Sequence, residues 1–130
     1  MITEFILLLA IVLVIDLTFL NLSGTVTHFS KLIEKIQGSP MKVKPIGAVL
    51  SYLFITFVLY YFIVKRNDNM MNAFILGAGL YGVYEYTSYA LLKKWDFMTT
   101  LTDTVWGGIL FAISLFTYNK LKRYINNMYI

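Results

Sequence analysis

The chain has 130 residues, of which 58% are hydrophobic and only 14% are Asp, Glu, Lys or Arg. Soluble domains average about 45–50% apolar and about 25% charged residues, and a water-soluble fold of this size could not hide so much apolar surface. The absence of cysteine excludes disulfides, thiolate metal sites and thiol catalysis. The net charge of +4 comes from short basic clusters between apolar segments. This pattern fits anionic lipid headgroups and argues against a nucleic-acid partner.

Four segments are long and apolar enough to cross a bilayer as helices, which takes roughly 20 residues each. Lipid-exposed backbone must satisfy its hydrogen bonds within its own segment, so helix is the expected state. The first segment lacks the basic start and the small-residue cleavage site of a secretory signal, and we interpret it as a span. The sequence therefore predicts a single all-α domain, a multi-pass integral membrane four-helix bundle. Its spans cover residues 5–22, 45–64, 70–92 and 101–118.

A short amphipathic helix is predicted between the first two spans, over residues 25–38. Its apolar residues follow the i, i+3, i+4, i+7 spacing of one helix face. A helix of this kind can lie in the membrane interface or pack on the end of the bundle, and the sequence leaves both arrangements open. The residues of the apolar face are Phe29, Leu32, Ile33 and Ile36.

Three acidic residues, Asp16, Glu85 and Asp103, fall within or at the edge of the predicted spans. An ionised carboxylate in hydrocarbon costs at least about 2.5–3.5 kcal/mol. Each acid is therefore expected to face a protein interior or a wet cavity, or to take up a proton. In an antiparallel bundle all three lie towards the same membrane face. We predict that they share one polar layer and handle protons or ions there.

Polar and small side chains follow single stripes on two of the spans. Hydroxyl groups at four-residue spacing would lie on one helix face, and buried hydroxyls need hydrogen-bond partners, for which the carboxylates are suitable acceptors. Trp106 follows Asp103 by one turn and could form the wall of a cavity. The predicted pocket-lining residues are Tyr52, Thr56, Tyr60, Tyr81 and Trp106. Small residues at the spacing that permits close helix approach are predicted helix contacts: Ala73, Gly77, Ala78 and Gly82.

Three functions fit such a polar core. The carboxylates could hold the helices together, they could conduct protons or cations, or they could form a catalytic or metal centre that acts on a lipid. No H-E-x-x-H or G-x-S-x-G motif supports an enzyme, and His28 is the sole histidine, so we predict no catalytic residue. Three acids could hold Mg²⁺ or Ca²⁺ through oxygen, which leaves a metal open.

Several pieces of the chain resemble the bacterial membrane protein family called domain of unknown function 2177. They are VIDLTFL around Asp16, the stretch GLYGVYEYTSYALLKKW that ends at Trp95, and TLTDTVWGG around Asp103. The family's second motif usually reads Tyr-Asp-x-Thr-Asn. Here Glu85 takes the place of its acid and Ser88 that of its amide, which adds Ser88 to the candidate pocket. The resemblance implies a four-span fold and brings no established activity.

We therefore predict a small membrane transport protein or a proton- or ion-conducting protein. A lipid-modifying enzyme or accessory factor is the first alternative, and a structural or assembly protein is the second. Four helices leave little room for a substrate path, so we expect a homo-oligomer. The lipid bilayer is the other expected partner, and no cofactor is predicted.

Overall fold

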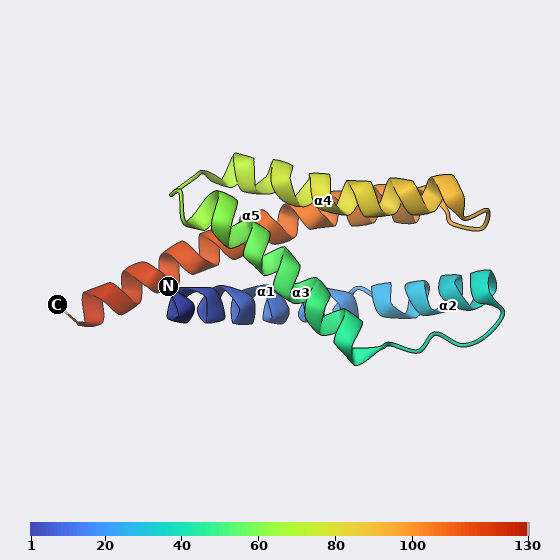
Figure 1. Ribbon diagram of the computed structural model, residues 1–130, viewed down its shortest axis with the longest axis horizontal. Coiled ribbons are helices and arrows are strands. Elements are labelled where there is room, and N and C mark those ends of the chain that lie inside the picture. Colours follow the sequence, from blue (N-terminus) through green and yellow to red (C-terminus); the bar gives the residue numbers. More distant parts are fainter. Residues whose placement is uncertain (130) are drawn as a thin grey trace.

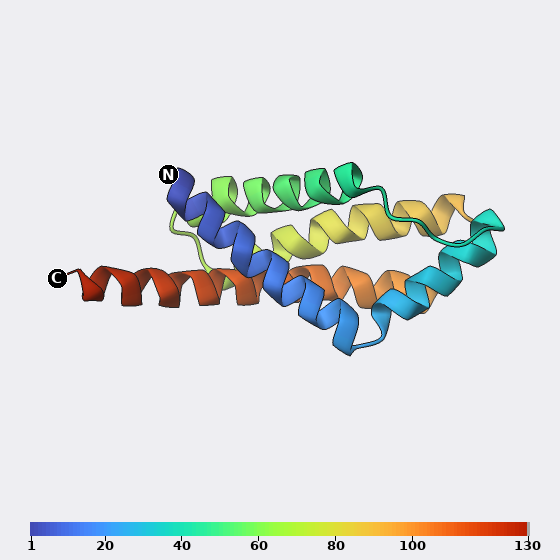
Figure 2. The same ribbon diagram turned by 90° about the horizontal axis from the view of Figure 1, so that it is seen from below.

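The computed structural model describes residues 1–129, which form helices and no strands. This confirms the all-α prediction. In Figures 1 and 2, α4 and α5 lie antiparallel and side by side, and α2 lies beside the end where they are joined. The elements are α1 (Ile2–Leu22), α2 (Thr25–Gln37), α3 (Pro45–Leu59) with its π-helical continuation η1 (Tyr60–Val64), α4 (Met70–Leu91) and α5 (Phe97–Met128).

Three of these helices are long and apolar enough to cross a membrane: α1, the combined helix Pro45–Val64, and α5. The fourth predicted span forms α4, with 22 residues and almost the predicted bounds, but it is not among the three. Its second half carries Glu85 together with tyrosine, threonine and serine side chains, and these lower its apolar character. That α4 also crosses the membrane stays a prediction.

Helix α5 is much longer than the predicted span, with 32 residues from Phe97 to Met128. It begins four residues earlier because Asp96 caps it, and the Asp96 carboxylate accepts a hydrogen bond from the backbone N–H of Thr99 at 2.6 Å. It continues beyond the span because no glycine or proline follows Gly108 to end it. Its C-terminal end projects past the other helices in both views (Figures 1 and 2).

Glycines bring α4 and α5 close together. A Cβ atom added to Gly77 would lie 2.7 Å from Cγ of Phe111, and one added to Gly82 would lie 3.3 Å from Cγ2 of Thr104. Of the other predicted helix contacts, Ala73 is fully buried in the core and Ala78 is half-buried. Gly77 and Gly82 therefore serve a contact within one chain, and a homo-oligomer stays a prediction.

Candidate functional site

Asp16 links three helices. It is only 5% exposed, and its carboxylate accepts a hydrogen bond from the Tyr52 hydroxyl of α3 and another from Nε1 of Trp106 of α5, at 2.8 Å in the second case. The Trp106 ring stacks on Phe19 of α1, with ring centroids 3.7 Å apart. Two neutral donors thus hold this carboxylate in place inside the bundle.

Glu85 of α4 is fully buried, at 0% exposure. Its Oε2 accepts a hydrogen bond of 2.9 Å from Nε1 of Trp95, whereas no donor among the described residues reaches its Oε1. The carboxyl group of Asp103 lies within hydrogen-bonding reach of the Glu85 carboxyl group. A hydrogen bond between two carboxyl groups requires that one of them carries a proton. A proton on either carboxyl group would allow the two to form such a bond.

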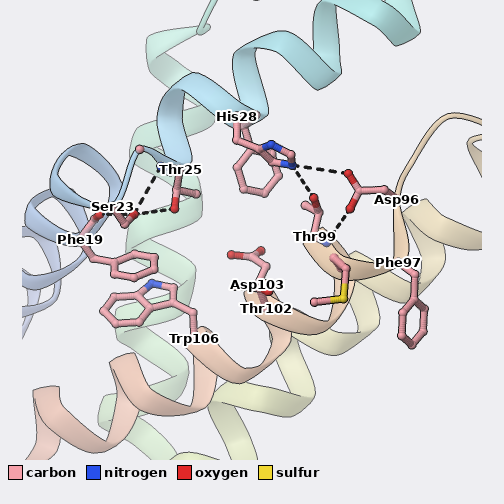
Figure 3. A pocket seen from close by; sticks show the side chains of 13 residues that line it. Phe19, Ser23, Thr25, His28, Asp96, Phe97, Thr99, Thr102, Asp103 and Trp106 are labelled. Atoms are coloured by element: carbon pink, nitrogen blue, oxygen red, sulfur yellow. Dashed lines mark hydrogen bonds and ion pairs between the residues drawn. The ribbon is translucent and has the colours of Figure 1, made fainter.

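Asp103 lies between two pockets and lines both. The first, which we call the α2 pocket, has a volume of about 470 Å³. Figure 3 shows the Asp103 carboxyl group in the middle of it, with Trp106 on one side and His28 across from it. The second, the α3–α4 pocket, has a volume of about 560 Å³ and also contains Asp16. Asp103 is thus in contact with both spaces.

A second polar group closes the α2 pocket towards the α4–α5 turn (Figure 3). Nε2 of His28 lies 2.7 Å from Oγ1 of Thr99 and 3.5 Å from Oδ2 of Asp96. Hydrogen bonds from Thr99 and the proximity of His28 hold the pKa of the Asp96 carboxyl group below its usual value. These contacts fix α2 against the start of α5.

The structure brings together some of the predicted pocket residues and separates others. Tyr52 and Tyr81 line the α3–α4 pocket with Asp16 and Asp103, and Trp106 lines the α2 pocket. The other three predicted residues, Thr56, Tyr60 and Ser88, line neither pocket. Thr56 is fully buried, and its hydroxyl meets no partner within residues 1–129. The Tyr60 hydroxyl donates to Glu4 at 3.3 Å, and the Ser88 hydroxyl donates to the backbone carbonyl of Tyr84.

Sequence reasoning missed the role of Trp95. A tryptophan beside two lysines at a span end is typical of the interfacial aromatic belt, but Trp95 is only 4% exposed and donates to Glu85. The contact joins the end of α4 to the turn that follows it, so it depends on the path of that turn. No spacing rule within a helix could have indicated it.

The two pockets are lined by acidic side chains without basic partners from Lys or Arg within residues 1–129. The described residues also contain no group of three or more His, Cys, Asp or Glu side chains arranged to hold a metal ion. The acids therefore contact phenol, indole and carboxyl groups. Their negative charge can be neutralised by protons or by a bound ligand.

These features define a helical integral membrane protein with a buried acidic cluster beside two pockets. The chain belongs to the family described as "Predicted membrane protein (DUF2177)", which matches residues 1–118, and this confirms the resemblance found in the sequence. Comparison with curated proteins and with solved structures gave no match.

Proposed function

We propose that this protein moves protons or small cations across the membrane, and that Asp16, Glu85 and Asp103 handle the charge. The observation that carries the proposal is the position of Asp103, which lines both pockets and lies within hydrogen-bonding reach of buried Glu85. Ionisable groups inside a membrane segment are costly, and they are typical of ion pathways and proton relays.

The geometry suggests an order of transfer. A proton in the α3–α4 pocket can pass between Asp16 and Asp103, because both line that pocket. The neighbouring carboxyl groups of Asp103 and Glu85 could hold the proton between them. From Asp103 the proton can leave through the α2 pocket, where Asp96 and His28 provide further polar groups. In this proposal α4 crosses the membrane with α5, since it carries Glu85.

A purely structural role for the acids is less well supported. Acids that only join helices are expected to be fully paired and inaccessible, as polar groups buried in a bundle need partners. Asp103 instead lines two pockets, and Glu85 has an oxygen that meets no donor among the described residues. Both features favour groups that change their protonation state.

A lipid-modifying or accessory function is a second candidate. The wall of the α3–α4 pocket includes Phe54, which is 67% exposed, and the exposed Leu80. A bilayer would surround these side chains, so the pocket can open sideways to lipid. The pocket contains a serine, Ser51, but its hydroxyl donates to the backbone carbonyl of Gly47, and no histidine lines the pocket to activate it. We therefore rank this function below proton or cation movement.

Flux measurements in liposomes test the proposal. Purified protein is reconstituted into vesicles that contain a pH-sensitive dye, and a pH step and a potassium gradient with valinomycin provide the driving force. We expect Asp16→Asn to lower proton flux at least about tenfold, because an amide cannot accept the proton, while the melting temperature in detergent changes little. Unchanged flux in the folded variant would remove the proposal.

Glu34→Gln is the matched control. Glu34 is an exposed acid of α2 that lines neither pocket. Its substitution removes one negative charge, as Asp16→Asn does. We expect it to leave the flux unchanged, so that a loss of flux is assigned to the position of Asp16 and not to the net charge.

A further inference from the structure

The α3–α4 pocket combines acidic and apolar side chains, a combination that proton movement alone does not require. Its polar part is formed by Asp16, Asp103 and three tyrosine side chains, and its remaining wall is mostly apolar. Its volume of about 560 Å³ is within the range of about 300–1,000 Å³ that is common for small-molecule sites. The lining residues are Asp16, Ala48, Ser51, Tyr52, Phe54, Ile55, Val58, Leu80, Tyr81, Tyr84 and Asp103.

Charge decides which ligand fits. Two carboxyl groups lie at the inner side of the pocket, and no basic side chain lines it within the described part of the chain. Behind Asp103, the fully buried Glu85 has an oxygen that meets no donor there. A positive group beside Asp103 would supply the missing counter-charge, and tyrosine ring faces attract cations as well. An anionic ligand would face uncompensated repulsion.

The wall argues for an organic cation over a metal ion. Ca²⁺ takes 6–8 oxygen ligands and Mg²⁺ prefers an octahedral shell, whereas the lining of this pocket includes the apolar side chains of Phe54, Ile55, Val58 and Leu80. Phe54 is 67% exposed and Tyr84 is 58% exposed, so the outer part faces the side of the bundle. An apolar body can lie along α3 while a cationic head reaches the acids.

We infer that the α3–α4 pocket binds amphiphilic organic cations, such as lipophilic amines or quaternary ammonium compounds, which enter from the bilayer. The inference rests on the proposed function, for which it names the substrate class. It also gives a coupling step. When the cation binds beside Asp103, a proton bound to the Asp103–Glu85 pair passes to water, and one positive charge replaces another.

Binding is tested with tetraphenylphosphonium, a permanent lipophilic cation, on the full chain in nanodiscs of zwitterionic lipid. Tetraphenylborate is the matched control, since it has a similar shape and the opposite charge. Equilibrium dialysis with empty nanodiscs as blank measures the binding. We expect saturable binding of the cation alone. Asp103→Asn should weaken it about tenfold or more, because a charge partner in the pocket is lost, and Glu34→Gln should leave it unchanged.

A second variant separates the pocket from the folding of the acid cluster. Ala48→Phe adds a ring to the pocket wall while all three acids stay in place, and we expect it to weaken cation binding by blocking the space. In weakly buffered solution at neutral pH, cation binding to the wild type should release up to one proton per bound cation. Asp103→Asn should abolish this release.

Three results would overturn the inference. They are equal binding of tetraphenylborate, full-strength binding of the cation by Ala48→Phe, and binding without any proton release. These results leave the proposed function testable by itself. If proton flux depends on Asp16 while tetraphenylphosphonium does not bind, the protein conducts protons and the organic cation is not its substrate. If flux is independent of Asp16, the proposed function is wrong.

Discussion

The two ends of the bundle hold their acidic side chains in different ways. At the end where α1 begins, Glu4 lies 2.5 Å from Nζ of Lys122, and both side chains are partly open to solvent. Tyr60 donates to the same carboxylate at 3.3 Å. At the other end, Asp16 and Glu85 are buried and accept hydrogen bonds from tyrosine and tryptophan side chains.

The difference shows what each carboxylate can contribute. An acid that is paired with a lysine near the surface has its charge compensated, and such pairs contribute about 0–1 kcal/mol. An acid that accepts hydrogen bonds only from neutral donors can be charged or protonated, and a ligand or a neighbouring group can shift this equilibrium. This difference supports the proposal that the acids at the end with Glu85 handle the charge, and it favours a structural role for Glu4.

The largest expected effect concerns the contact that brings Glu85 towards Asp103. Gly77→Ala would place a Cβ 2.7 Å from Cγ of Phe111 and 2.9 Å from the backbone carbon of Gly107. Backbone atoms of α5 cannot move aside cheaply, so we expect a loss of about 3 kcal/mol in the free energy of unfolding. Unfolding in mixed micelles with increasing fractions of sodium dodecyl sulfate measures it.

Gly79→Ala is the matched control on the same helix. A Cβ at Gly79 has nothing within 4 Å, and alanine favours helix over glycine, so this variant should be unchanged or more stable by up to about 1 kcal/mol. Equal stability of the two variants would show that α4 and α5 are not in close contact, and the Glu85–Asp103 pair would then lose its support.

A smaller loss of stability is expected when the hydrogen-bond donors to the acids at the two ends are removed. Trp95→Phe keeps an aromatic ring beside Phe29 but leaves both oxygens of buried Glu85 without an indole donor. We expect a loss of about 2 kcal/mol, since a buried group without its partner costs about 1–3 kcal/mol. Tyr60→Phe removes a donor from Glu4, which keeps Lys122, and should cost less than about 1 kcal/mol.

Both variants are measured by thermal unfolding in the same detergent. A larger loss for Tyr60→Phe than for Trp95→Phe would reverse the comparison between the ends. It would indicate that the Glu4 cluster is the more tightly held one, and that Glu85 has access to water in place of Trp95.

The sequence predicts most of the helices because their signals are local. Residues 45–64 and 70–92 were predicted as helices, and the structure has Pro45–Val64 and Met70–Leu91. The common position of Asp16 and Asp103 also follows from sequence, because depth in an antiparallel bundle can be counted along each helix. Helix α4 is less apolar than the three candidate spans because of its tyrosines and Glu85.

The parts that the sequence does not predict depend on segments between helices. Trp95 reaches Glu85 through the turn after α4, and His28 reaches Thr99 because α2 folds back over the start of α5. Such contacts depend on the conformation of a few linking residues, which periodicity does not describe. Tyr60 is a case in which helix spacing misleads. The spacing puts Tyr60 in line with Tyr52 and predicts a shared pocket, but the two hydroxyls donate to acids at opposite ends of the bundle.

The smallest expected loss of stability comes from removing the helix caps, one at each end of the bundle. Asp96 caps α5 by accepting a hydrogen bond from the Thr99 backbone, and Asn69 caps α4 by accepting one from the Asn72 backbone at 2.8 Å. Asp96→Ala and Asn69→Ala should each cost about 1 kcal/mol at neutral pH. Their pH dependence should differ, because only Asp96 ionises.

The pKa of Asp96 is lowered below its usual 3.8 by hydrogen bonds from Thr99 and by His28. A lowered folded-state pKa gives stability that is present above the unfolded-state value and is lost as the pH falls through the folded-state value. The stability difference between wild type and Asp96→Ala should therefore shrink below about pH 3.8, whereas the difference for Asn69→Ala stays constant. Thermal unfolding between pH 2 and 7 measures both. Parallel curves would mean that the Asp96 carboxylate does not cap α5, and that the polar link between α2 and α5 depends on the contact of His28 with Thr99.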